Sequence, residues 1–171
     1  MKLLFPVFLL VGSILSGFFF SEHSGQTEIR EALPEASLQG AEVFGCLIND
    51  QPWVAQEVQA HLYTFEHSVC LSVRSGEDLE DRLAFIIQGT ALKPGRYVLD
   101  DQAKDYIHLQ RNESECTFVS DEFYQAVLTI HEHDEHLKRL SGTFEFLAYS
   151  QSCSTAIRGT HGRFNVSYST Y

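Results

Sequence analysis

The chain has 171 residues, a formal net charge of −11 and an aromatic content of 12%. Its 12 lysine and arginine residues are scattered, whereas nucleic-acid binding needs clustered cations that neutralise phosphates, and an anionic lipid surface repels an acidic chain. We therefore expect neither nucleic acid nor an anionic membrane surface as a partner of the folded region. Abundant Phe and Tyr beside a single Met favour strands over helices.

The N-terminal residues have the pattern of an export signal. Lys2 precedes an apolar run from Leu3 to Phe20, with the small residues Ser16 and Gly17 near its end. This order predicts a secretory signal peptide over residues 1–20. A run of about 18 residues is also close to the lower length limit of a membrane-spanning helix, so an uncleaved anchor stays open as the alternative. Both alternatives place the rest of the chain outside the cytoplasm, in the periplasm or at the cell surface.

The end of the apolar run indicates no lipid anchor. Leu15, Ser16 and Gly17 resemble the start of a bacterial lipoprotein box, but Phe18 stands where the acylated Cys is required.

Residues 21–40 are polar and acidic, with too few apolar side chains to offset the entropy of ordering, and they predict a flexible linker. The remainder, 41–171, is long enough for a single domain with its own core.

From residue 41 onward, short alternating apolar runs are separated by turn residues. Expected strands cover residues 43–48, 59–65, 68–74, 83–89, 97–99, 106–111, 124–130, 143–149, 156–159 and 163–168. Short strands at this spacing predict an all-β fold, and specifically an antiparallel β-sandwich, with a partly closed β-barrel as the alternative.

The clearest pattern is a hairpin over residues 128–149. Leu128 and Ile130 alternate on the first strand, and Phe144 and Phe146 alternate on the second. The dipeptide Ser141–Gly142 at the start of the second strand is expected to form a β-bulge or an edge contact.

Four blocks of the folded region resemble one family. Residues 44–53 are similar to its opening pattern F-x-C-x-(I/V)-N-G-x-x-W, and residues 94–99 to its G-x-Y-x-L. Residues 127–130 and 140–146 together resemble its G-x-L-T-I … I-S-G-T-F-x-F, and residues 162–166 its closing T-D-G-R-F-D. The family consists of small exported Bacteroidota proteins, often lipoproteins, that are built on a domain of unknown function. The resemblance covers residues 41–168 and implies an all-β fold and a cell-envelope location, and no activity.

Two departures from the family pattern affect these expectations. The lipoprotein Cys is missing, which removes the expected route to membrane anchoring. Asn49–Asp50 replaces the usual Asn–Gly, so a hairpin loop wider than two residues is expected there.

The four cysteines, Cys46, Cys70, Cys116 and Cys153, predict two disulfides, because an even number in an exported chain is typical of a disulfide framework. Three connectivities are open, and our working expectation is Cys46–Cys153 with Cys70–Cys116. Free, buried thiols are the alternative. No pair has the C-x-x-C spacing of zinc ribbons or thioredoxin-type proteins.

One histidine cluster suggests a metal site. His131 and His133 are two residues apart on an expected strand and so project to one side, and a turn would bring His136 back toward them. Three imidazoles beside carboxylates are suitable ligands for zinc or copper. The competing interpretation is a solvated polar hairpin tip that holds no ligand.

A second candidate surface consists of aromatic residues. Trp53, Tyr97 and Tyr106, together with Tyr63 and Tyr149, are candidates for stacking against a sugar, although strand aromatics also form core and cross-strand pairs. No hydrolase motif such as G-x-S-x-G is present, and we predict no catalytic residues.

The sequence therefore favours a non-enzymatic cell-envelope module that binds a glycan or another protein and needs no cofactor. The alternative is a metal-binding protein that holds zinc or copper with His131, His133 and His136.

Overall fold

The computed structural model of the chain describes residues 42–55, 57–65, 67–75, 81–89, 91–100, 105–110 and 116–171. The expected signal peptide (1–20) and linker (21–40) lie outside the described residues. The described strands are β1 (Val43–Ile48), β2 (Gln51–Val54), β3 (Val58–Thr64), β4 (Ser68–Ser75), β5 (Asp81–Gln88), β6 (Gly95–Leu99), β7 (Tyr106–Gln110), β8 (Thr117–Val119), β9 (Ala126–Asp134), β10 (Arg139–Ser150) and β11 (Thr155–Thr170). No described segment forms a helix with the length and apolar character needed to cross a membrane.

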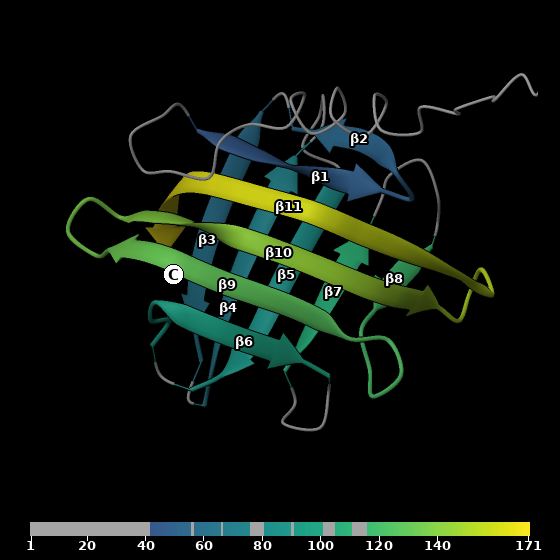
Figure 1. The fold of residues 1–171 in the computed structure, drawn as a ribbon. Coiled ribbons are helices and arrows are strands. Elements are labelled where there is room, and N and C mark those ends of the chain that lie inside the picture. The colour runs from purple at the N-terminus through teal and green to yellow at the C-terminus, as the bar shows by residue number, and fades with distance from the viewer. Residues whose placement is uncertain are drawn as a thin grey trace, which may run out of the picture.

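Hydrogen bonds join all eleven strands into one sheet that folds over into two layers (Figure 1). The front sheet contains β2, β1, β11, β10, β9 and β6, and the back sheet contains β3, β4, β5, β7 and β8. The strands of the two sheets cross at a large angle in Figure 1. The predicted all-β sandwich is thus confirmed, and its sheets have the crossed arrangement in which strands connect the layers at the corners.

Two corners connect the sheets. At one corner the end of β11 (Tyr168–Thr170) pairs with β3 in parallel, whereas the other described strand pairs are antiparallel. At the opposite corner Tyr149 of β10 pairs with Val119 of β8 through a single described position. The second corner therefore has little backbone pairing of its own.

The inner faces of both sheets form one hydrophobic core, as the alternating pattern predicts. Val69, Leu71 and Val73 of β4 face the core, and so do Leu83 and Phe85 of β5. The largest fully buried side chains include Phe44, Phe85, Phe144, Phe164, Leu109 and Leu128. Burial of these apolar side chains is the main favourable term in folding.

Three cross-strand pairs in the front sheet each place a phenylalanine opposite a glycine. The pairs are Gly142 with Phe164, Phe144 with Gly162, and Phe146 with Gly159, all between β10 and β11. A Cβ atom added to any of the three glycines would overlap the ring of the opposite phenylalanine. At Gly142 and Gly162 it would also meet a backbone oxygen, that of Thr129 or Phe144. These positions need glycine because the rings lie directly over them.

A β-bulge in β11 keeps the rings and glycines aligned. Between the last two pairs, β10 has one residue, Glu145, whereas β11 has two, Thr160 and His161. The extra residue is accommodated at His161, whose φ is 54°. The break expected between strands 156–159 and 163–168 is therefore wrong, because the chain forms one continuous strand that bends at this bulge.

The loop between β1 and β2 is also tighter than expected. Ile48 pairs with Gln51, which leaves Asn49 and Asp50 as a two-residue loop. Their φ values are 48° and 64°, the left-handed region that Asn and Asp tolerate best after Gly. The Asn49 side chain accepts a hydrogen bond of 2.9 Å from the backbone N–H of Arg158. The expected wider loop is wrong because Asp at the second position can replace the usual Gly.

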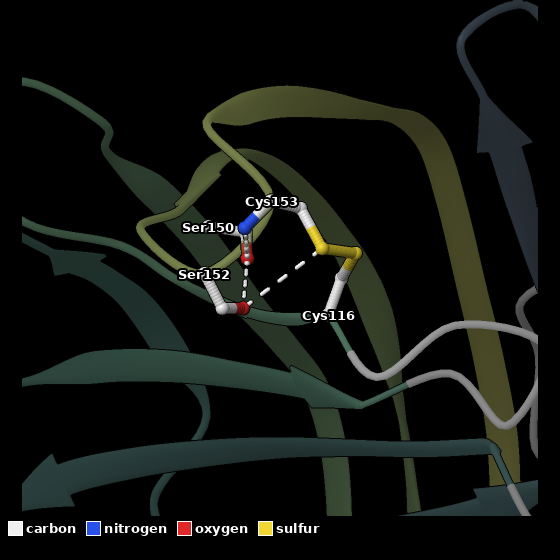
Figure 2. The surroundings of a disulfide bond; sticks show 4 residues. All are labelled: Cys116, Ser150, Ser152 and Cys153. Atoms are coloured by element: carbon white, nitrogen blue, oxygen red, sulfur yellow. Dashed lines mark hydrogen bonds between the residues drawn. A yellow bond between two sulfur atoms is a disulfide. The ribbon is translucent and has the colours of Figure 1, made fainter.

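One disulfide joins Cys116 to Cys153, with a Cα–Cα distance of 5.7 Å (Figure 2). Cys116 directly precedes β8, and Cys153 lies in the turn between β10 and β11. The bond therefore reinforces the corner at which β8 and β10 share a single paired position. In Figure 2 the same turn is held by a hydrogen bond from the Cys153 backbone N–H to Ser150 Oγ, at 3.4 Å.

The expected pairing of Cys46 with Cys153 and of Cys70 with Cys116 is corrected by this bond. Cys46 is fully buried on the inner face of β1. Cys70 is buried on β4, and burial raises the pKa of its thiol. Neither Cys46 nor Cys70 takes part in a disulfide.

We predict that substitution of Gly159 by Ala lowers the free energy of unfolding by about 1–3 kcal/mol, because the new methyl group overpacks the site against the Phe146 ring. Phe146→Leu should relieve part of this clash, so the double variant should be more stable than the sum of the single effects predicts. Urea denaturation measures all three values. The mismatched combination of Gly159→Ala with Phe164→Leu is the control and should be additive. Additivity in the matched pair would contradict the Phe–Gly contact.

Thiol titration should find no rapidly reacting thiol in the folded protein, two after unfolding without reductant and four after reduction, because Cys46 and Cys70 are buried thiols outside the disulfide. Replacing Cys116 and Cys153 together by Ser should cost roughly 3–4 kcal/mol, from the entropy of a loop with a sequence separation of 37. The matched variant Cys46→Ala/Cys70→Ala should retain the disulfide. Four reactive thiols in the unfolded, unreduced chain would rule out the bond.

Candidate binding surfaces

The structure separates the three histidines of the expected metal site. Ser141 pairs with Glu132 and Gly142 pairs with Ile130, so His131 is the extra residue of a β-bulge in β9. The bulge expected at Ser141–Gly142 is confirmed, and its extra residue lies on the facing strand. Because a bulge shifts the alternation by one residue, His131 and His133 point to opposite sides of the sheet. Their expected projection to one side is wrong.

His133 turns toward the core and is bonded at both ring nitrogens. It lies opposite the fully buried Leu140. Its Nδ1 is 2.8 Å from the backbone oxygen of Leu92, and its Nε2 is 2.7 Å from the hydroxyl of Tyr168. A carbonyl oxygen only accepts, so Nδ1 carries the proton, and in the neutral ring Nε2 accepts from Tyr168. Burial, together with the charges of Glu135 and Asp134, raises the pKa of Tyr168 and keeps its hydroxyl a donor.

The other two histidines are exposed and form no metal-binding group with His133. His131 is exposed, and its Nε2 lies 3.4 Å from Thr143 Oγ1. His136 is exposed in the hairpin turn, where its backbone N–H donates to Asp134. Among the described residues, no three His, Cys, Asp or Glu side chains are grouped in a way that would hold a metal ion. The tip of the β9–β10 hairpin is instead a solvated turn, and His133 beside it faces the core.

The expected sugar-stacking residues are also dispersed. Trp53 packs against the core and contacts Phe44 edge-on, with ring centroids 5.7 Å apart. Tyr97 packs against the core as well, and its hydroxyl donates to the backbone oxygen of Lys93 at 2.7 Å. Tyr149 stacks on Tyr124 at 5.2 Å. Each of these rings is therefore engaged within the fold.

Tyr106, which is half-buried, differs from Trp53 and Tyr97 because it lies on an outward sheet face that carries a second candidate, Tyr63. Tyr106 pairs with Ile86, Ile86 with Cys70, and Cys70 with Tyr63. Residues that pair directly across strands point to the same face. Tyr106 and Tyr63 thus face outward from the back sheet, about 14 Å apart by strand spacing.

An aromatic row lies at the edge of this face, where β3 meets the end of β11. It consists of His61, Tyr63, Phe65 and Tyr171. Tyr63 has its ring centroid 6.4 Å from Phe65 and 5.5 Å from Tyr171, with interplanar angles of 17° and 24°. Phe65 and Tyr171 are 57% and 73% exposed. Large aromatic side chains that are exposed together mark an interaction surface more often than isolated ones do.

The histidine of the row forms a polar pair with Ser169. The His61 ring lies 5.3 Å from the Tyr171 ring, and its Nδ1 is 2.7 Å from Ser169 Oγ. The row therefore combines three nearly parallel rings with an imidazole and a hydroxyl. The sequence indicated part of this row, because the alternation of His61, Tyr63 and Phe65 along one expected strand places the three side chains on the same face. The contribution of Tyr171 arises from the parallel pairing of β11 with β3, which leaves no local pattern.

The outer face of the front sheet carries a shallow groove, the front groove, made of two adjoining hollows. One hollow has a volume of about 390 Å³ and is lined by Arg96, Thr129, Thr143, Glu145, His161 and Arg163, among others. The second has a volume of about 490 Å³ and is lined by Gln125, Leu147, Arg158 and Thr160, among others. Val127 and Glu145 line both hollows, so the two are continuous.

A third hollow, of about 340 Å³, lies at the end of the sandwich near the hairpin tip. It is lined by His133, Tyr168, Glu135 and Lys138 over an apolar floor that includes Leu62. Lys138 Nζ donates to Thr170 Oγ1 at 3.3 Å. Because both nitrogens of His133 are already bonded, this hollow offers a ligand fewer polar groups than its lining suggests.

Two titratable groups on or next to β7, away from these hollows, have pKa values shifted from their ordinary values. Burial raises the pKa of Asp105, and burial together with the charge of Arg82 lowers that of His108. A catalytic site is expected to combine a pocket with such groups. Neither Asp105 nor His108 lines any of the three hollows described above.

Comparison with known proteins finds one family. Searches among curated proteins and among solved structures gave no match. Residues 40–166 match the family described as a domain of unknown function (DUF6252), a region that includes all strands except the end of β11. The match covers well over half of the chain, and the protein belongs to the DUF6252 family.

Proposed function

We propose that the protein is an exported cell-envelope module that binds a glycan through the aromatic row and catalyses no reaction. The nearly parallel rings of Tyr63, Phe65 and Tyr171, of which Phe65 and Tyr171 are exposed and Tyr63 is half-buried, carry the proposal. The cationic and apolar N-terminal pattern supports export, which would bring the module into contact with envelope or extracellular polysaccharides.

The chemistry of the row suits a sugar. A pyranose presents C–H groups on its faces, which pack on aromatic rings, and hydroxyls at its rim, which need hydrogen-bond partners. Tyr63, Phe65 and Tyr171 offer the ring surfaces. The imidazole of His61, the hydroxyl of Ser169 and the tyrosine hydroxyls offer polar groups at the edge.

The size of the row favours a glycan over a protein partner. A stable protein–protein interface buries about 800 Å² on each partner and involves roughly 20–30 residues a side. The row has four residues, and the back-sheet face beside it includes polar positions such as Arg74. A few aromatic rings provide enough stacking surface for one or two sugar units, but they cover much less area than a stable protein interface needs.

The test is glycan binding by single alanine variants of the row. Tyr63→Ala and Phe65→Ala should each weaken binding of a glycan identified on an array by roughly tenfold, a loss of about 1.4 kcal/mol, because each removes one stacking surface. Isothermal titration calorimetry measures the affinity. Because Phe65 is 57% exposed, its truncation should leave the thermal unfolding temperature nearly unchanged.

Phe123→Ala is the matched control, since Phe123 is 77% exposed and precedes β9, away from the row. It should bind the glycan as the unmodified protein does. Equal weakening by Phe123→Ala, or full affinity in Tyr63→Ala, would reject the row as the glycan site. A protein ligand captured by the row with no glycan bound would reject the glycan proposal itself.

A further inference from the structure

We propose that the front groove is a second binding site, specific for a carboxylate-bearing polysaccharide. It lies on the opposite sheet from the aromatic row, so this inference is independent of the function proposed above. The observation behind it is the gathering of arginines on one sheet face of a strongly acidic protein.

The charges lining the front groove oppose those of the chain as a whole. The full chain has 23 Asp and Glu residues against 12 Lys and Arg. The groove instead is lined by three arginines, Arg96, Arg158 and Arg163, with Glu145 as the acidic side chain among its lining residues. At physiological ionic strength charges are screened beyond about 8 Å, so a bound anion is affected mainly by these nearby arginines.

The arginines come from two strands that hold them at fixed positions. Arg96 is exposed on the edge strand β6, where it pairs with Thr129 of β9. Arg163 pairs with Thr143 of β10, and both are on β-strands in the middle of the front sheet. Planar guanidinium groups bind carboxylates through two parallel hydrogen bonds, which gives both strength and orientation.

The remaining lining suits the hydroxyl-rich backbone of a polysaccharide. Thr129, Thr143 and Thr160 provide hydroxyl groups, and Gln125 provides an amide that both donates and accepts. The two continuous hollows, of about 390 and 490 Å³, form a trough across β9, β10 and β11. Such a trough fits several consecutive sugar units with carboxylates at intervals.

An acidic polypeptide fits the groove less well. Peptides that bind sheets as extended strands use the free backbone groups of an edge strand. The floor of the groove is formed by β9, β10 and β11, each of which pairs on both sides with neighbouring strands. Their backbone groups are therefore committed to the sheet, and recognition must come from side chains.

The experiment compares polygalacturonate and alginate with fully methyl-esterified polygalacturonate, which has the same backbone without the charge. Calorimetry with the full chain should detect binding of at least one carboxylated polymer and at least a tenfold weaker interaction with the methyl ester. The affinity for the carboxylated polymer should fall as salt is raised, as expected for an interaction between opposite charges.

Arg96→Gln and Arg158→Gln should each reduce the affinity at least fivefold, because both side chains are exposed and line the groove. Arg74→Gln, an exposed arginine on the back sheet, is the matched control and should have no effect. Tyr63→Ala should also have no effect, which separates this site from the aromatic row.

Three results would overturn the proposal. They are no binding of either carboxylated polymer, equal binding of the methyl ester, or full affinity in both groove variants. Tighter binding of poly-glutamate than of either polysaccharide would show that the ligand class is wrong. A loss of binding in Tyr63→Ala together with full affinity in Arg158→Gln would assign the carboxylated polymer to the aromatic row instead.

Discussion

The fold depends on the packing of Phe144 between the two sheets. Its ring stacks on Phe44 of β1 at 5.2 Å, and it contacts Phe85 of the back sheet at 5.5 Å with the planes 64° apart. The ring reaches these neighbours because it lies over Gly162, where any side chain would occupy its place. One side chain thus connects the front sheet, the back sheet and the glycine on the neighbouring strand. Its contacts are close-packed, so a single added methyl group is costly.

The alignment of rings over glycines also shapes both candidate surfaces. The bulge at His161 keeps Phe146 over Gly159, and β11 continues beyond it to the corner where it pairs with β3. That pairing brings Tyr171 against Tyr63 and completes the aromatic row. On the outer face, the same bulge places His161 in the lining of the front groove. The two surfaces are therefore consequences of the way the core is packed, and they lie on opposite faces of the sandwich.

Local features of the fold were predictable from the sequence, whereas features that depend on distant contacts were not. The hairpins β3–β4 and β9–β10 follow from alternation and turn residues, and the bulge at Ser141–Gly142 was expected. The alternation rule failed at His133 because one bulged residue reverses the direction of the side chains that follow. The disulfide between Cys116 and Cys153 and the contact of Tyr171 with Tyr63 arise at corners between sheets, which leave no periodic signal. Trp53 and Tyr97 were expected to be available at the surface for stacking on a sugar, but both side chains pack against the core.

The central functional claim is that exposed rings at the junction of β3 and β11 form the glycan-binding surface. Nuclear magnetic resonance of the labelled protein, titrated with a bound oligosaccharide, tests it most directly. We expect the largest chemical-shift changes, and the nuclear Overhauser contacts to sugar C–H protons, to involve the rings of His61, Tyr63, Phe65 and Tyr171. Contacts confined to other residues, with the signals of these four rings unchanged, would contradict it.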